Sequence, residues 1–198
     1  MLSGLNSPQK QAVRHTDSPL LVLAGAGSGK TTVITRKICW LMEKCAVPPE
    51  NIFAVTFTNK AAKEMRARIT SRTGNDKNKT KASEAVTICT FHALGLKIIS
   101  SHQAEFNLRK GFNIIDGEDS RTIIKNLLPL AQGSDKQIVY GVHQCISNWK
   151  GSLIDPGQAL TEHANNPDAL LAAKIFPDYI KTLQAYNVLD FDDLIYLP

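Results

Sequence analysis

Residues 20–31 have the sequence Leu-Leu-Val-Leu-Ala-Gly-Ala-Gly-Ser-Gly-Lys-Thr, an apolar run followed directly by a glycine-rich turn. The four consecutive apolar residues, with no polar alternation, predict a strand over 20–24 that is covered on both faces, as in a parallel sheet. A helix is expected to begin at Lys30 and to run to about Lys44. A buried strand, a tight turn and an amphipathic helix therefore follow one another, and this order decides the fold class.

The turn itself matches a phosphate-binding pattern. Residues 24–31 fit GxxxxGK[ST], except that Ala24 replaces the first glycine. Glycines let successive backbone N–H groups point inward around an anion, and the following helix adds the positive end of its dipole. Lys30 would neutralise the β- and γ-phosphates, and the Thr31 hydroxyl would bind the Mg²⁺ ion that bridges them. The predicted nucleotide-binding residues of the loop are Ala24, Gly25, Ala26, Gly27, Ser28, Gly29, Lys30 and Thr31; Lys30 and Thr31 are also the predicted catalytic residues, and Thr31 is the predicted metal ligand.

Strands and helices continue to alternate in the first half of the chain. Apolar runs predict strands over 52–57 and 86–90, and a one-sided apolar pattern predicts a helix over 59–72 between them. This order indicates crossover connections and a parallel sheet with helices on its faces. A short helix with Ser7 as its N-cap is expected before the first strand. Residues 73–84 lack periodicity and are expected to form a basic surface loop.

After His92 the pattern becomes mainly helical, and a strand is indicated only over 112–115. The predicted helices span 94–101, 118–130, 135–149 and 168–186. Asp116 precedes the second of them and is interpreted as its N-cap.

Composition and charge limit the possible partners. The 198 residues are 43% hydrophobic and 21% charged, which is typical of a globular protein. Residues 1–100 contain 15 Lys and Arg against 6 Asp and Glu, whereas residues 101–198 contain 8 against 12. The basic first half points weakly to phosphate or nucleic acid. The 4 cysteines form no CxxC pair, and neither a signal peptide nor a membrane span is indicated, so we expect a cytoplasmic protein with free thiols.

Three further strings can be compared with known families. They are Leu5-Asn6 with Gln9, Thr-Phe-Thr-Asn-Lys-Ala-Ala at 56–62, and Thr-Phe-His at 90–92. Together with the phosphate loop, they resemble superfamily one DNA helicases of the UvrD/Rep type. Residues 146–150 and 187–195 resemble the helical accessory subdomain of that family and its exit, so the resemblance extends over the whole chain.

The resemblance and the element order predict an α/β fold: a P-loop NTPase (RecA-like) parallel sheet flanked by helices, with an inserted all-helical subdomain. The expected divisions are residues 1–104 as the first part of an ATP-binding motor core, 105–185 as the helical accessory subdomain, and 186–198 as a return to the core.

For function, the resemblance implies an ATP-driven motor that moves 3′ to 5′ along single-stranded DNA and separates duplex. It implies ATP and Mg²⁺ as cofactors, and single-stranded DNA and duplex junctions, but no membrane, as partners. Gln9 would bond the adenine edge. Thr32 stands where the family usually has Arg, and Arg36, one turn later, is expected to substitute in part near the nucleotide.

The resemblance also implies a DNA-binding surface at the strand ends, where ligands of open α/β sheets bind. Aromatic side chains there would stack on bases without reading sequence, and hydroxyls, amides and lysine would bind phosphates. The predicted DNA-binding residues are Phe57, Thr58, Asn59, Lys60, Thr90, Phe91, His92 and Phe191. Without the resemblance, the residue types alone would favour Phe57 and Phe91 as core aromatics.

Phosphoryl transfer at such a loop needs an acidic residue at the end of a second strand, and none is identified. Asp116 is interpreted as a helix cap. Asp190 is interpreted as a cap for a helix whose first turn contains Asp192 and Asp193, rather than as a metal ligand. The resemblance places the acidic pair and the second motor domain after Pro198. We therefore expect the chain to be the N-terminal part of the enzyme and not to hydrolyse ATP by itself.

Three alternatives remain open at this point. A helicase–nuclease would share these motifs and add a nuclease domain downstream. A stand-alone P-loop kinase or nucleotide-binding regulator would transfer phosphate or bind nucleotide without DNA. A DNA-binding module would use the loop only for the phosphate backbone, and ATP would not change its affinity for DNA.

Overall fold

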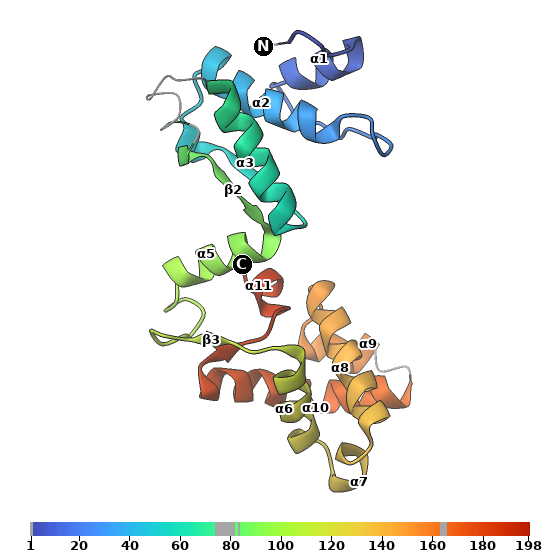
Figure 1. Ribbon diagram of the computed structural model, residues 1–198. Helices are drawn as coiled ribbons and strands as arrows, with labels where there is room; N and C mark the ends of the chain where they lie inside the picture. The colour runs from blue at the N-terminus through green and yellow to red at the C-terminus, as the bar shows by residue number, and fades with distance from the viewer. Residues whose placement is uncertain (1, 74–81, 83, 163–165) are drawn as a thin grey trace. The chain divides into compact units, whose positions relative to one another are not determined.

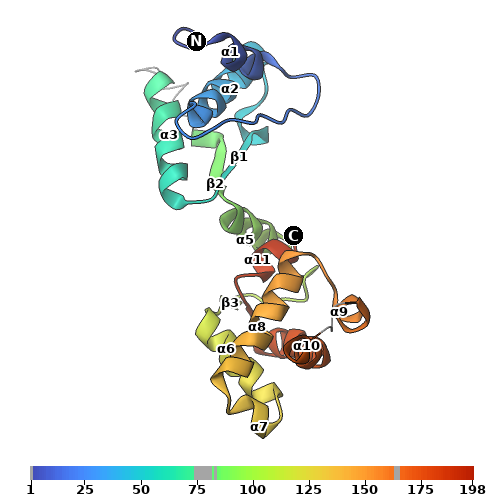
Figure 2. The ribbon, with the colours of Figure 1, turned by 90° about the vertical axis from the view of Figure 1, so that its right-hand side faces the viewer.

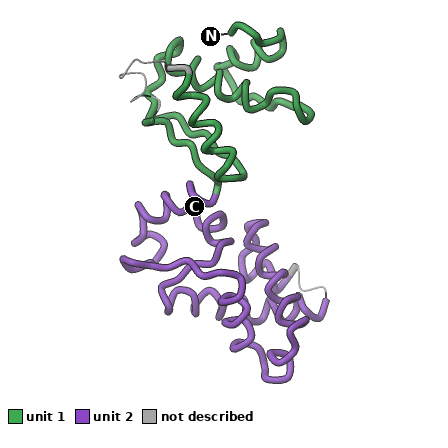
Figure 3. Tube along the Cα trace, in the orientation of Figure 1, with its two compact units in different colours: residues 1–91 green, residues 92–198 purple. Residues whose placement is uncertain are grey.

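The computed structural model describes residues 2–73, 82, 84–162 and 166–198. The chain forms two compact units, residues 1–91 and residues 92–198, coloured separately in Figure 3. In the described part of the chain, none of the helices is both long enough and apolar enough to span a bilayer.

Unit 1 contains a parallel pair of strands covered by helices. Its elements are α1 (Ser7–Arg14), α2 (Lys30–Lys44), the 3-10 helix η1 (Pro49–Asn51), β1 (Phe53–Thr56), α3 (Asn59–Thr73) and β2 (Thr87–Thr90). The strands pair in parallel register from Phe53 opposite Thr87 to Thr56 opposite Thr90. Helix α3 packs on both strands and on α2, and α1 packs on α2 (Figures 1 and 2). The predicted strand, helix, strand order over 52–90 is confirmed.

The strand predicted over 20–24 is wrong for this structure. These residues form no helix or strand, and Leu21 and Leu23 are 82% and 87% exposed. A cavity of about 490 Å³ is lined by Leu20 and Val22 on one side and by residues of β1 on another. A strand exists only through hydrogen bonds to neighbours, and the described sheet of unit 1 consists of β1 and β2 alone. The apolar run therefore lies beside the sheet without joining it.

The start of α1 differs by one residue from the prediction. Asn6, not Ser7, is the N-cap residue, and its side chain accepts a hydrogen bond from the Gln9 backbone N–H at 2.9 Å. Gln9 Oε1 accepts from the Asn6 backbone N–H at 3.0 Å in return, which completes a capping box. Pro8 then occupies a first-turn position where its missing N–H costs nothing.

The helix predicted over 59–72 is confirmed as α3. Helix α3 buries Ala62, Met65 and Ile69 against the strands, as its apolar pattern indicates. Most of the basic loop expected over 73–84 lies outside the described residues.

Unit 2 is mainly helical, as its pattern predicts. Its elements are α5 (Phe91–Ser101, which begins at the last residue of unit 1), β3 (Asn113–Ile114), α6 (Gly117–Leu127), α7 (Leu130–Gly133), α8 (Lys136–Gly151), α9 (Pro156–Glu162), α10 (Pro167–Tyr186), β4 (Val188–Leu189) and α11 (Asp193–Tyr196). Strands β3 and β4 pair in parallel. The sequence pattern did not predict α7, α9 and β4, and the helix predicted over 118–130 ends at Leu127.

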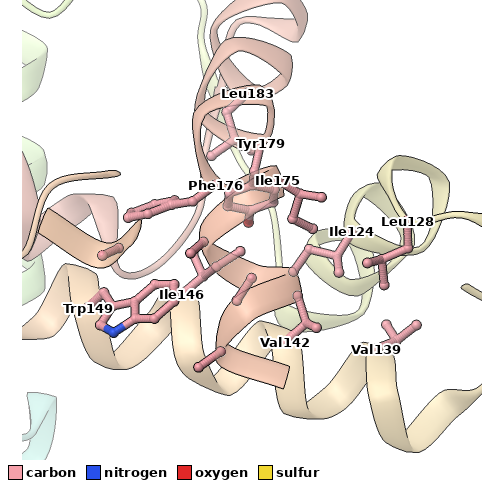
Figure 4. Packing of buried hydrophobic residues seen from close by; sticks show 14 residues of the cluster. Ile124, Leu128, Val139, Val142, Ile146, Trp149, Ile175, Phe176, Tyr179 and Leu183 are labelled. Carbon is pink, nitrogen blue, oxygen red and sulfur yellow. The ribbon is translucent and has the colours of Figure 1, made fainter. Parts of the chain in front are cut away.

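The core of unit 2 lies between α6, α8 and α10 (Figure 4). Ile124, Val142 and Phe176 are fully buried there, and Trp149 packs against Phe176 with ring centroids 5.9 Å apart. Asp116 caps α6 as predicted, because its side chain accepts hydrogen bonds from the backbone of the first turn. Those two bonds lower the pKa of the Asp116 carboxyl.

Candidate functional site

The glycine-rich loop has the backbone that its sequence requires. Gly27 has φ 74° and Gly29 has φ 86°, in the left-handed region that favours glycine. Gly29 is the N-cap of α2, so the loop leads directly into the N-terminal end of that helix. A Cβ at Gly29 would lie 3.0 Å from Gln9 Nε2, whereas one at Gly25 would meet nothing within 4 Å. Gly29 is thus required both for its conformation and for the space it leaves.

The side chains of the loop bond to its own backbone. Lys30 Nζ donates to the carbonyl oxygens of Ala24 at 3.0 Å and of Gly25 at 2.7 Å. Ser28 Oγ donates to the same Gly25 oxygen at 2.7 Å. The Lys30 ammonium therefore lies over the loop, next to the N-terminal end of α2. Ala26 is exposed, and Thr31 is half-buried in the first turn of the helix.

Gln9 joins α1 to this loop. Its Nε2 donates to the Ser28 carbonyl oxygen at 3.0 Å, while its Oε1 accepts from Asn6. Both ends of the amide are therefore engaged within the protein. The predicted adenine contact of Gln9 stays a prediction, and making it would require the amide to exchange at least one of these bonds.

A cavity of about 350 Å³ lies beside the loop. Its walls combine apolar side chains from the start of the chain, the run 22–24 and α2 with a few polar groups, an arrangement typical of small-molecule sites. The lining residues are Asn6, Pro8, Gln9, Ala12, Val22, Leu23, Ala24, Ser28, Lys30, Val33 and Ile34. Among these described residues the only ionisable side chain is the lysine, so an anionic ligand would meet one positive charge.

Thr32 and Arg36 lie along α2 as predicted, but Arg36 points to a different partner. Its Nη2 donates to the Ser3 carbonyl oxygen at 3.2 Å, and it does not line the cavity. Thr32 accepts a hydrogen bond at its carbonyl from the buried Thr35 hydroxyl. The expected substitution of Arg36 for a nucleotide-binding arginine stays a prediction.

The two aromatic residues predicted at the strand ends are exposed and close together. Phe57 follows β1 and is 91% exposed, and Phe91 follows β2 and is 46% exposed. Their ring centroids lie 5.6 Å apart. Parallel strands end at the same edge, so β1 and β2 bring the rings together. Both rings lie outside the core, contrary to the expectation from residue type alone.

The sequence strings 56–62 and 90–92, which contain these two aromatic residues, also contain polar residues, of which some are exposed and others are buried. Asn59 and Lys60 are exposed in the first turn of α3. The Thr58 hydroxyl accepts from the Ala61 backbone N–H at 3.1 Å and so caps that helix. Thr90 is only 8% exposed, which leaves its side chain little access to a ligand.

His92 and Phe191 form a second aromatic contact, within unit 2. Their ring centroids are 6.4 Å apart and the rings meet edge to face. Phe191 is 54% exposed and His92 is exposed at the start of α5. The fold thus brings together two predicted residues that are far apart in the sequence.

The acidic residues around Phe191 belong to a buried ionic network. Lys150 of α8 is fully buried, and its Nζ donates to Asp190 Oδ2 and to Asp193 Oδ1, each at 2.7 Å. The Tyr179 hydroxyl of α10 donates to Asp190 Oδ2 at 2.9 Å. Asp190 Oδ1 accepts from the Asp193 backbone N–H at 2.9 Å and so closes the turn before α11. The N-cap residue of α11 is Asp192, however, so the prediction that Asp190 caps this helix is wrong. Among the described residues, no group of three or more potential ligands could bind a metal ion.

Burial and charge act in opposite directions on this network. Burial opposes ionisation of Asp190, but the Lys150 charge and several hydrogen bonds outweigh it and lower the pKa of that carboxyl. Burial raises the pKa of Asp193 to about 6, with the neighbouring Asp190 charge contributing. Burial also raises the pKa of the Tyr179 hydroxyl. For Lys150, burial opposes the charge, but the two carboxylates raise the pKa of the ammonium.

The predicted site residues do not include Lys150 and Arg66, although both make hydrogen bonds that join separate elements of the fold. Lys150 continues the buried row of α8 formed by Val139, Val142 and Ile146, so a charge at a core position was the available signal. The helical pattern over 59–72 puts Arg66 of α3 opposite the apolar face, which favours a solvated side chain, but its Nη2 donates to the Ile88 carbonyl of β2 at 2.7 Å. No sequence pattern pairs a helix arginine with a strand carbonyl.

The chain matches the model of the UvrD/REP helicase N-terminal domain over residues 5–198. It is 42% identical over 194 residues to the ATP-dependent DNA helicase Rep of Escherichia coli, covering 98% of this chain and 28% of that protein. It is 37% identical over 196 residues to the ATP-dependent DNA helicase PcrA of Staphylococcus epidermidis, covering 98% and 26%. With the ATP-dependent DNA helicase UvrD1 of Mycobacterium tuberculosis the identity is 40% over 203 residues, covering 98% and 25%. The chain spans about a quarter of the length of these relatives.

Proposed function

The chain belongs to the UvrD/REP helicase N-terminal domain family, and from this premise we propose that it forms the ATP- and DNA-binding part of a 3′–5′ DNA helicase. The relatives named above are ATP-dependent DNA helicases. In the proposed function, the phosphate loop binds ATP, and the aromatic residues after β1 and β2 contact single-stranded DNA. Residues 105–185 form the helical accessory subdomain of this motor.

The observation that carries the proposal is that one compact unit combines the phosphate loop with exposed aromatic rings. The left-handed Gly27 and Gly29 and the N-terminal end of α2 favour a phosphate group. Phe57 and Phe91 offer exposed ring surface, which stacks on bases regardless of sequence. A kinase needs the first feature but has no need of the second.

In the nucleotide site, Lys30 would exchange its two loop carbonyls for phosphate oxygens and neutralise their charge. Thr31, in the first turn of α2, would offer its hydroxyl to Mg²⁺. Magnesium, if bound there, would supply positive charge that offsets the charge of the phosphates. Gln9 would recognise the adenine edge while it remains next to the Ser28 carbonyl.

We expect the 198-residue chain to bind ATP and single-stranded DNA weakly, and not to hydrolyse ATP or unwind duplex. The cavity beside the loop includes no carboxylate among the described residues that line it. Lys30 and Thr31 alone do not orient a water molecule for attack on the γ-phosphate. Robust DNA-stimulated ATP hydrolysis by the purified chain would contradict this part of the proposal.

The test separates the two sites by substitution. Binding of a fluorescent ATP analogue with Mg²⁺ and of a labelled oligothymidine is measured for the chain and for Lys30→Ala and Phe57→Ala. Loss of a charge-assisted contact in Lys30→Ala should weaken ATP binding by about tenfold to a hundredfold. Loss of a stacked ring in Phe57→Ala should weaken DNA binding by about tenfold.

Lys30→Ala should leave DNA binding nearly unchanged, and Phe57→Ala should leave ATP binding nearly unchanged. Lys63→Ala is the matched control for loss of a positive charge, because Lys63 lies on the exposed side of α3. If Lys30→Ala weakens DNA binding and the chain binds no ATP analogue, the loop binds backbone phosphate and the helicase proposal fails. ATP binding without any DNA binding would favour a nucleotide-binding regulator instead.

A further inference from the structure

The turn that presents Phe191 is closed at both ends by its own carboxylates. Asp190 N donates to Asp193 Oδ2 at 3.2 Å, and Asp193 N donates to Asp190 Oδ1 at 2.9 Å. Asp190 and Asp193 are each 5% exposed, whereas Phe191 between them is 54% exposed. The turn therefore buries its two acidic ends and directs the ring outward.

Lys150 connects these ends to the helical core. Each carboxylate uses one oxygen for the backbone of the turn and the other for Lys150 Nζ. The Tyr179 hydroxyl of α10 donates a further hydrogen bond to Asp190 Oδ2. Two helices, α8 and α10, thus determine where the turn lies.

A buried ion pair is seldom needed for stability, because apolar side chains of similar volume serve as well. Its hydrogen bonds are directional, however, and specify one arrangement where apolar contacts would allow several. Lys150 with two carboxylates also leaves a net negative charge in the core, which is costly. Such a network is better suited to fixing a position than to adding stability.

The other side of the turn is fixed by close packing on α5. A Cβ at Gly95 would lie 1.8 Å from the Leu194 carbonyl oxygen, so α11 approaches α5 as closely as a glycine allows. Leu189 and Leu194, on either side of the turn, are buried with Ile99 of α5. His92 is one turn before Gly95 on the same helix, and its ring meets that of Phe191. The turn is therefore located between the ionic network and α5.

We propose that Lys150 is a positioning residue for Phe191: by binding both carboxylates of the turn, it holds the ring beside His92, where a base of single-stranded DNA can stack on it. This role rests on the proposed DNA-binding function of the chain. Lys150 is fully buried and does not itself contact DNA. Its contribution to DNA binding passes entirely through the position of Phe191.

The experiment compares oligothymidine affinity in the full chain for Phe191→Ala, Lys150→Met and the double variant, by fluorescence anisotropy. Phe191→Ala should weaken binding by about tenfold through loss of stacking. Lys150→Met should weaken binding by a similar factor, and the double variant should bind no worse than Phe191→Ala. ATP-analogue binding should stay unchanged in all three.

Two further variants keep the test decisive. Tyr179→Phe removes one hydrogen bond from Asp190 while it retains the charges, so it should fold even if Lys150→Met does not, and it should weaken DNA binding by about twofold or threefold. Lys181→Met is the matched control, because this lysine is 74% exposed and pairs only locally with Asp178. It should lose no more affinity than one surface charge accounts for.

The outcomes separate this inference from the function on which it rests. If Phe191→Ala binds DNA normally, the proposed DNA role of Phe191 is wrong. If Phe191→Ala weakens binding but Tyr179→Phe and folded Lys150→Met do not, the positioning role is wrong and the network is only structural. Losses that multiply in the double variant would also overturn it, because they would show that Lys150 acts independently of the ring.

Discussion

Unit 1 and unit 2 differ in where their apolar side chains lie. In unit 2 the apolar faces of α6, α8 and α10 meet in one core, and Ile124, Val142 and Phe176 are fully buried. In unit 1, Leu21 and Leu23 are more than four-fifths exposed although they form the most apolar run in that half. Helices form their backbone hydrogen bonds internally and need only a neighbouring apolar face, whereas a strand needs a neighbouring strand for its backbone hydrogen bonds.

The charged residues show the reverse distribution. Lys30 and Lys60 of unit 1 are exposed, at a loop and a helix start that offer them to ligands. Lys150, Asp190 and Asp193 of unit 2 are buried and bond to one another. These two lysines of unit 1 are therefore accessible to ligands, while the three buried charged groups of unit 2 bond to one another beside the exposed Phe191 ring.

The largest expected effect is on stability, and it compares removal of a buried ring from the core of unit 2 with removal of an exposed ring from unit 1. Phe176→Ala removes a fully buried ring that packs on Trp149 and should reduce the free energy of unfolding of unit 2 by about 3–5 kcal/mol. Phe57→Ala removes a ring that is 91% exposed and should change stability by less than about 0.5 kcal/mol.

Urea unfolding followed by tryptophan fluorescence measures this difference. The chain has 2 tryptophans, so a Trp40→Phe background leaves Trp149 as the reporter for unit 2, and a Trp149→Phe background leaves Trp40 as the reporter for unit 1. Equal losses for the two phenylalanine variants would mean that the units do not differ in packing as described.

The next effect concerns pH and the buried charges. Burial raises the pKa of Asp193 from 3.8 to about 6, so the folded state binds this proton more tightly than the unfolded state. The resulting stabilisation is complete below the unfolded pKa and is lost as pH rises through about 6, by up to about 3 kcal/mol. Asp190 has a lowered pKa and acts in the opposite sense, losing its contribution as pH falls below 3.8.

Asp193→Asn should remove the loss of stability that accompanies ionisation of Asp193 as pH rises. The wild-type chain should lose stability relative to Asp193→Asn between about pH 4 and about pH 7, as measured by thermal unfolding of unit 2. Parallel stability curves for the two proteins over that range would show that Asp193 does not titrate as a buried acid.

A smaller effect concerns the phosphate loop. Gly29→Ala places a side chain at φ 86° and should destabilise unit 1 by about 1–2 kcal/mol, in addition to displacing Gln9. Gly25→Ala is the matched control, because its φ is not positive and a Cβ there has space. Circular dichroism melting of both variants tests this, and a Gly25→Ala chain as unstable as Gly29→Ala would contradict the loop geometry.

The smallest effect concerns the strand pair of unit 1. Arg66→Ala removes the hydrogen bond to the Ile88 carbonyl and should cost about 1 kcal/mol, while Lys63→Ala on the same helix should cost less than about 0.5 kcal/mol. Hydrogen exchange of the β2 amides reports this difference. Identical exchange in the two variants would remove Arg66 from the interactions that stabilise the sheet.

Local patterns were sufficient to predict most helices and the tight backbone of the glycine-rich loop. The bounds of α2, Lys30–Lys44, follow from its apolar periodicity and the glycines before it, and the Asp116 cap follows from a side chain that bonds to its own next turn. These features depend on residues within one or two turns of each other, so the sequence determines them without the rest of the fold. The run 20–24 shows the limit, because its apolar pattern is satisfied only by strands that lie elsewhere in the chain.

Tertiary structure alone decided which of the predicted site residues meet. Phe57 with Phe91, and His92 with Phe191, are contacts between separate elements, and only the parallel pairing of β1 with β2 and the packing of α11 on α5 create them. Lys150 likewise depends on the tertiary structure, because its charge at a core position of α8 is neutralised only by Asp190 and Asp193, which the fold brings beside it. A sequence specifies local backbone through short-range sterics and hydrogen bonds. A buried charge, by contrast, is stabilised only by partners that the complete fold brings within hydrogen-bond distance.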